Sequence, residues 1–173
     1  ISTLGMMMMA RGAALLITGG APVGGFPDRF AYLGGTRGWY IPVGIMAGIV
    51  AVLTVMLVAT RFGRATYAIG GNSQSARLSG IPVARTRMMV FVICAMLAGF
   101  AGIVETSRPM IASPTGAEGY ELEAIAACVI GGASLMGGEG TVIGAIAGTL
   151  IMQVLVNLCN LLGIETDWQK ILV

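Results

Sequence analysis

The chain has 173 residues, of which 56% are hydrophobic and only 10% are charged, and 27 are glycine. A chain with so few charged residues cannot cover the surface of a soluble globular protein with polar groups. The composition therefore indicates an all-α, polytopic membrane helix bundle. A net charge of +2 gives no reason to expect a nucleic-acid partner, and the lack of histidine excludes imidazole catalysis and histidine metal sites in these residues. Cys94, Cys128 and Cys159 lie in apolar stretches without CxxC spacing, so we expect small buried side chains and neither a disulfide nor a metal site.

Gaps between charged residues mark the expected membrane spans. A helix needs about 20 residues to cross a hydrocarbon core about 30 Å thick. Residues 38–60 and 140–164 reach this length without a charge, and residues 88–104 reach it if the flanking charges lie at the interfaces. Residues 2–18 contain Arg11, which either faces protein or marks a helix lying partly in the interface, and we expect a span there.

A fifth apolar stretch, residues 124–138, is shorter and interrupted by glycine. As a helix it would extend only about 22 Å, and it contains the pairs Gly131-Gly132 and Gly137-Gly138. Irregular backbone at membrane depth must be surrounded by protein or must line a water-filled cavity. The sequence therefore predicts a broken segment within the bundle, with a tilted, glycine-packed helix as the alternative.

Residues 61–87 form an arginine-rich segment that contains no acid. Short loops rich in Lys and Arg are retained in the cytoplasm, so we place this segment inside and residues 19–37 and 105–123 outside. The arginines are Arg61, Arg64, Arg77, Arg85 and Arg87. Within the segment, the sequence predicts a short helix over residues 73–78, because Asn72 can cap its start, Gly80 can end it and Pro82 prevents its continuation.

The last expected span carries a row of polar residues. Thr149, Gln153, Asn157 and Asn160 recur at steps of four, four and three, which places them on one helix face. Amide groups without partners are costly in lipid, so we expect this face to point into protein. Two interpretations stay open: one wall of a pathway for a hydroxylated or otherwise uncharged solute, or hydrogen bonds between helices.

Small residues four apart allow close packing of membrane helices. Such pairs occur in three of the expected spans and predict a tight bundle. They are Gly44 with Gly48, Ala95 with Gly99, and Gly144 with Gly148.

Specific motifs also follow one another in a definite order. They are Tyr67-Ala68-Ile69-Gly70-Gly71-Asn72, Ala76-Arg77-Leu78-Ser79-Gly80-Ile81, Gly119-Tyr120-Glu121-Leu122-Glu123-Ala124-Ile125-Ala126-Ala127, Ile130-Gly131-Gly132, Gly137-Gly138-Glu139-Gly140-Thr141 and Trp168-Gln169. Over nearly the whole chain this pattern resembles the membrane permease subunits of ribose-type bacterial ABC sugar importers. Glu139 departs from it, because related sequences often carry a basic residue there.

The resemblance implies a transport subunit of the bacterial inner membrane that imports a monosaccharide such as ribose. It implies no catalytic residue, no metal site and no cofactor in this chain. Its expected partners are a cytoplasmic ABC ATPase carrying ATP and Mg, a periplasmic solute-binding protein, a second permease copy and the lipid bilayer. Family members have further spans before residue 1 and one after Trp168, so we expect the C-terminal portion of a single permease domain. A branched-chain amino acid permease and an ion-coupled carrier or channel remain alternatives.

The resemblance also places the contact with the ATPase in the arginine-rich segment. The implied residues are Gly71, Asn72, Ala76, Arg77, Gly80 and Ile81. The other arginines of the segment are then expected only to hold it in the cytoplasm. Lys170 is the one lysine of the chain and does not belong to a GxxxxGK[ST] motif, which agrees with ATP binding on a separate subunit.

Overall fold

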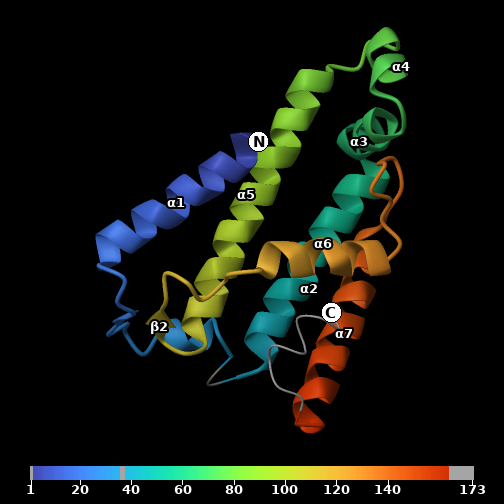
Figure 1. Ribbon diagram of the computed structural model, residues 1–173. Coiled ribbons are helices and arrows are strands. Elements are labelled where there is room, and N and C mark those ends of the chain that lie inside the picture. The colour runs from blue at the N-terminus through green and yellow to red at the C-terminus, as the bar shows by residue number, and fades with distance from the viewer. Residues whose placement is uncertain (1, 36–37, 164–173) are drawn as a thin grey trace. The chain divides into compact units, whose positions relative to one another are not determined.

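The computed structural model describes residues 2–35 and 38–163 (Figure 1). Within these ranges most of the chain is helical and the two strands have only two residues each, which confirms the expected all-α class. The helices are α1 Ser2–Thr18, η1 Phe30–Tyr32, α2 Tyr40–Ala59, α3 Arg61–Gly71, α4 Ser73–Leu78, α5 Val83–Ser107, α6 Tyr120–Ile130 and α7 Val142–Leu161, with the strands β1 Val23–Gly24 and β2 Ile111–Ala112.

Three helices of the described ranges are long and apolar enough to cross a membrane: α2, α5 and α7. α2 and α7 lie within the expected spans 38–60 and 140–164, although Ile164, the last residue of the second span, lies outside the described residues. α1 occupies residues 2–18 as expected, but it is a shorter apolar helix.

α5 is longer at both ends than the expected span 88–104. A gap between charges marks only the apolar part of a helix. The backbone hydrogen bonds continue through charged residues whose side chains can reach water. Arg85, Arg87 and Glu105 therefore belong to the helix instead of ending it.

Most of the arginine-rich segment is helical, although the sequence predicted only its short second helix. Thr60 caps α3 by accepting a hydrogen bond from the backbone N–H of Gly63 at 3.3 Å. A Cβ atom on Gly63 would lie 1.9 Å from the carbonyl oxygen of Leu57, so the chain turns from α2 into α3 through a corner that only glycine permits.

The chain divides into two compact units, and the first comprises residues 1–47 and 93–118. In it β1 and β2 pair antiparallel, with Val23 opposite Ala112. The buried hydroxyl of Ser107 donates a hydrogen bond to the carbonyl oxygen of Phe30. The segments 19–37 and 105–123, expected as outer loops, are thus joined by backbone and side-chain hydrogen bonds.

Arg11 of α1 is paired within the same unit. Its guanidinium lies 3.2 Å from a carboxylate oxygen of Glu118, and its side chain is only 24% exposed. Of the two interpretations that the sequence left open, the structure favours an arginine that faces protein.

The second unit comprises residues 48–92 and 119–173, of which those after Gly163 are not described. Here α3 packs on α4 and α6 packs on α7. α6 ends at Ile130, and residues 131–141 form an irregular loop. The broken segment is therefore confirmed, and the alternative of one continuous helix over residues 124–138 is wrong. The break follows from glycines at positive φ, which a helix cannot contain: Gly132, Gly137, Gly138 and Gly140.

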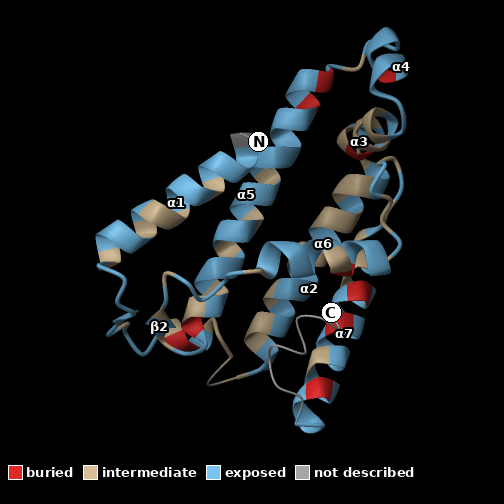
Figure 2. Ribbon diagram, in the orientation of Figure 1, coloured by how far each residue is buried: buried red, intermediate tan, exposed pale blue. Residues whose placement is uncertain are grey.

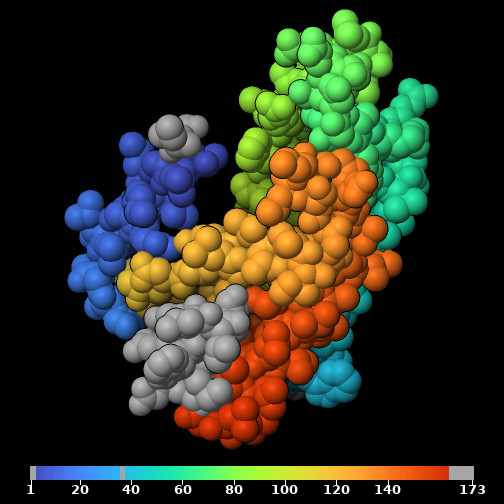
Figure 3. Space-filling model, turned by 45° about the vertical axis from the view of Figure 1, so that its right-hand side comes forward, coloured from blue at the N-terminus to red at the C-terminus, as the bar shows by residue number. Residues whose placement is uncertain are grey.

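α6 and α7 lie side by side (Figure 3), and their backbones come into direct contact. A Cβ atom on Gly148 would lie 1.9 Å from the carbonyl oxygen of Ala127, and one on Gly144 would lie 2.2 Å from that of Gly131. The predicted pair Gly144 and Gly148 thus allows a close helix contact. Gly44, Gly48 and Gly99, in contrast, have nothing within 4 Å of an added Cβ apart from their sequence neighbours and the backbone of their own helix.

The buried residues of α7 form a narrow stripe (Figure 2). They are Gly148, Met152 and Cys159. Cys159 fits the expectation of a small buried side chain, whereas Cys94 and Cys128 are exposed in this chain. Apolar residues in a membrane helix face lipid or a neighbouring helix equally well, so their type alone does not determine burial.

Candidate functional site

The short helix α4 begins and ends with the predicted signals. The side-chain oxygen of Asn72 accepts hydrogen bonds from the backbone N–H groups of Gln74 and Ser75, each at 3.0 Å. At the other end Gly80 has φ of 79°, and the N–H of Ile81 donates to the carbonyl oxygen of Ala76 at 3.1 Å. This is the Schellman arrangement, which fixes where a helix stops. The predicted helix over residues 73–78 is confirmed.

The Asn72→Ala substitution should destabilise α4 without changing any residue within the helix. It removes both capping hydrogen bonds, and such losses cost about 1 kcal/mol. We expect faster amide hydrogen exchange across residues 73–78 in the purified full-length protein. Asn72→Asp keeps a side-chain acceptor and serves as the control, so equal exchange rates in the two variants would contradict the capping role.

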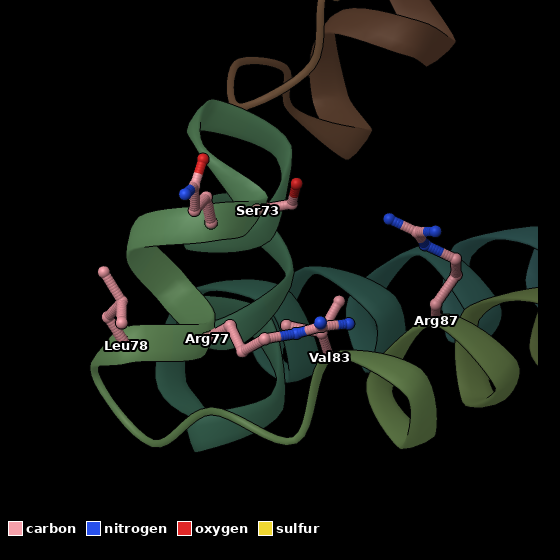
Figure 4. Close-up of a pocket in the computed structure, with 6 residues that line it drawn as sticks. Ser73, Arg77, Leu78, Val83 and Arg87 are labelled. Carbon is pink, nitrogen blue, oxygen red and sulfur yellow. The ribbon is translucent and has the colours of Figure 1, made fainter.

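An open groove with a volume of about 480 Å³ lies between α4 and the start of α5 (Figure 4). Its two charged residues are Arg77 from α4 and Arg87 from α5, and no acidic residue lines it. Such a groove favours a carboxylate or another anionic group. Its lining consists of Ser73, Gln74, Arg77, Leu78, Val83 and Arg87.

The six residues expected at the ATPase contact are placed differently from one another. Gly71, Asn72, Arg77 and Gly80 are exposed, and Ile81 is half-buried. Ala76 is only 4% exposed, so its side chain packs inside the segment and is not available at the surface of this chain. α4 packs on α3, and Ala76 is the one buried residue of α4.

Arg87 is a groove residue that the sequence interpretation missed. The sequence analysis expects it only to hold the segment in the cytoplasm, because it lies outside the motifs that carry the resemblance. The chain reverses between Gly80 and Pro82 and brings the first turns of α5 back beside α4. Gly80 and Pro82 predict that the chain turns, but they do not predict the direction in which α5 continues.

The polar row of α7 lies beside, and not on, its buried stripe. All four of its members are exposed in this chain, whereas the stripe that packs inward is made by other residues. Thr149 donates its hydroxyl hydrogen to the carbonyl oxygen of Ala145 in its own helix, at 2.9 Å. Packing of α7 against α6 therefore does not fulfil the expectation that the row points into protein. The row consists of Thr149, Gln153, Asn157 and Asn160.

No group of three or more His, Cys, Asp or Glu residues that could hold a metal ion occurs in residues 2–35 and 38–163.

Comparison with known proteins defines the family. The family model described as "Branched-chain amino acid transport system / permease component" matches residues 1–173. The chain belongs to this permease family. It is 45% identical, over 99% of its length, to the ribose import permease protein RbsC of Escherichia coli K12, and 42% identical over 99% to that of Bacillus subtilis 168. It is 40% identical over 95% of its length to the L-arabinose transport system permease protein AraH of Escherichia coli K12.

The chain spans about half the length of these curated relatives, covering 55%, 54% and 51% of them. No solved structure gave a significant match. The resemblance to ribose-type permeases is confirmed. The chain is thus part of a permease-family membrane protein, and α2, α5 and α7 are long and apolar enough to cross a bilayer.

Proposed function

We propose that the whole protein imports a monosaccharide, such as ribose, across the bacterial inner membrane as the permease subunit of an ATP-driven ABC importer. The observation that carries this proposal is the 45% identity, over almost the entire chain, to a ribose import permease. The family description mentions branched-chain amino acids, but the individual relatives reported above are named for sugars. An amino acid permease or an ion-coupled carrier is therefore less well supported.

The proposed importer divides its work among several chains. A cytoplasmic ATPase binds ATP and Mg and drives transport, a periplasmic solute-binding protein delivers the sugar, and a second permease copy completes the pathway. The exposed, well-capped helix α4 in an arginine-rich segment supports this division, because such a helix can be held by another protein without being deformed.

Within this scheme the ATPase contacts α4 and the groove beside it. Arg77 and Arg87 bind acidic side chains of the ATPase, and Gly71, Asn72, Gly80 and Ile81 shape the ends of the docking helix. Ala76 acts from inside, since its small buried side chain lets α4 pack closely within the segment. This adds Arg87 to the residues proposed from the sequence.

The sugar pathway runs along the polar row of α7. Side-chain amides and hydroxyls can donate to and accept from sugar hydroxyl groups, and the row is exposed in this chain. In a bilayer, amides facing hydrocarbon would be costly. A water-filled pathway or a helix of the rest of the importer would remove this cost.

The transport proposal is tested in proteoliposomes that contain the full-length protein, its ATPase and its solute-binding protein. Labelled ribose, L-arabinose, galactose and leucine are supplied separately with ATP. ATP-dependent accumulation of at least one sugar supports the proposal. Accumulation of leucine alone, or sugar uptake that does not need ATP, would refute it.

The Arg87→Gln substitution should weaken retention of the ATPase during purification of the full-length protein. A charge-assisted contact to a carboxylate contributes about 1.5–3 kcal/mol, so binding should fall by tenfold or more, at about 1.4 kcal/mol per decade. Arg85→Gln is the matched control, because Arg85 is also exposed at the start of α5 but does not line the groove. Equal losses in the two variants would indicate a general effect of charge and would contradict a specific contact.

A further inference from the structure

The last turn of α3 touches the glycine loop between α6 and α7 within the second unit. A Cβ atom on Gly70 would lie 2.4 Å from the backbone nitrogen of Gly138, and one on Gly137 would lie 2.8 Å from the carbonyl oxygen of Gly70. A Cβ on Gly138 would lie 2.9 Å from the Cα of Gly71. No side chain separates these segments, and Figure 3 shows the orange loop directly beside the green segment.

A hydrogen bond one turn earlier in α3 strengthens this contact. The hydroxyl of Tyr67 donates to the carbonyl oxygen of Gly140 at 2.6 Å. Tyr67 and Gly70 are three residues apart and thus lie on the same face of α3. Two points of attachment, one polar and one of backbone packing, restrict rotation of the loop against α3.

The two sides of this contact lead directly to the two proposed sites. On one side Gly71 is followed at once by Asn72, the cap of α4. On the other side the loop ends at Thr141, which caps α7 by accepting a hydrogen bond from the N–H of Gly144 at 2.9 Å. The loop begins at Gly131, where α6 and α7 are in backbone contact.

We propose that the contact of Gly70 and Gly71 with Gly137 and Gly138, together with the Tyr67–Gly140 hydrogen bond, transmits displacement of α4 to the α6–α7 pair. The inference rests on the proposed function, since it assumes that an ATPase moves α4. Backbones in contact without intervening side chains transmit a push with little slack, because no rotamer can absorb it. The loop and the end of α3 are thus positioning elements that couple ATP hydrolysis to movement of the polar row.

The test uses the full-length permease with its ATPase and solute-binding protein in proteoliposomes. In Gly70→Ala, the added methyl group must displace the loop. We expect the ATPase to copurify as with the wild type and to hydrolyse ATP, while sugar uptake per ATP hydrolysed falls by about tenfold, within the range found along coupling networks. Tyr67→Phe removes only the hydroxyl and should cause a smaller loss of the same kind.

Gly102→Ala is the control, because Gly102 is also a helical glycine and an added Cβ there would meet nothing within 4 Å beyond its sequence neighbours and its own helix backbone. It should transport as the wild type does. If Gly70→Ala and Tyr67→Phe couple hydrolysis to uptake as well as Gly102→Ala, the proposal is wrong. It is also wrong if either variant loses the ATPase, because the residues would then build the ATPase contact itself.

A second measurement does not depend on transport. Binding of the ATPase to the wild-type permease should change amide hydrogen exchange in residues 134–140 as well as in residues 72–81. In Gly70→Ala the change at 72–81 should persist and the change at 134–140 should be lost. An unaltered response at 134–140 would overturn the inference, whereas a wild-type permease that does not retain the ATPase at all would overturn the proposed function instead.

Discussion

We expect the Gly148→Val substitution to force α6 away from α7 and to destabilise the permease more than any other change considered for this helix pair. Even the first added atom would lie 1.9 Å from the carbonyl oxygen of Ala127, which is backbone and cannot rotate away. Overpacking of this kind costs about 3 kcal/mol or more. The measurement is the thermal unfolding midpoint and the yield of monodisperse full-length protein in detergent.

Ala147→Val provides the comparison for this prediction. Ala147 is the preceding residue of α7 and is exposed, so the same β-branched side chain enters a position with free space. Its midpoint should remain near that of the wild type. Similar losses in both variants would mean that β-branching at this point of the helix, and not the contact with α6, decides stability.

The Arg77→Glu substitution is expected to abolish ATP-dependent sugar uptake while the protein remains in the membrane. It replaces one of the two cations of the groove by an anion, so attraction to an acidic partner becomes repulsion. Binding of the ATPase should therefore become weaker by at least about 2 kcal/mol. Uptake by proteoliposomes and copurification of the ATPase should be lost together.

Arg85→Glu changes the net charge of the arginine-rich segment by the same amount without altering the groove lining. It should retain most of the uptake. Normal uptake by Arg77→Glu would remove α4 from the ATPase contact. Complete loss in both variants would indicate that total positive charge matters and that the position of Arg77 does not.

The sequence could predict α4 because its signals are local. The cap at Asn72 and the stop at Gly80 use side-chain and backbone properties of neighbouring residues, and the structure has both hydrogen-bonding patterns. α3 was not predicted, since the charge-based interpretation treated its polar residues as those of a loop. β1 and β2 were missed for another reason: two-residue strands are too short to show an alternating pattern.

The site shows the same division between local and distant information. The spacing of Gly144 and Gly148 predicted a close approach, but it could not name Gly131 and Ala127 as the backbone opposite. The sequence correctly places the four polar residues in one helix, α7. However, α7 packs against α6 through its buried stripe, which lies beside the polar row. Contacts between distant segments depend on turn geometry, which the residue types within a helix do not encode.

The loop from Gly131 to Thr141 has a further property that follows from its composition. Gly132, Gly137, Gly138 and Gly140 all have positive φ. Glycine loses more conformational entropy on ordering than any other residue, so a loop with four of them has little intrinsic preference for its folded shape. Its order comes from hydrogen bonds within the loop, such as that from the N–H of Ser134 to the carbonyl oxygen of Glu139, and from the contacts with α3 and α7. The stiffness of this connection therefore depends in part on its neighbours, and any process that shifts α3 also changes how freely the loop can move.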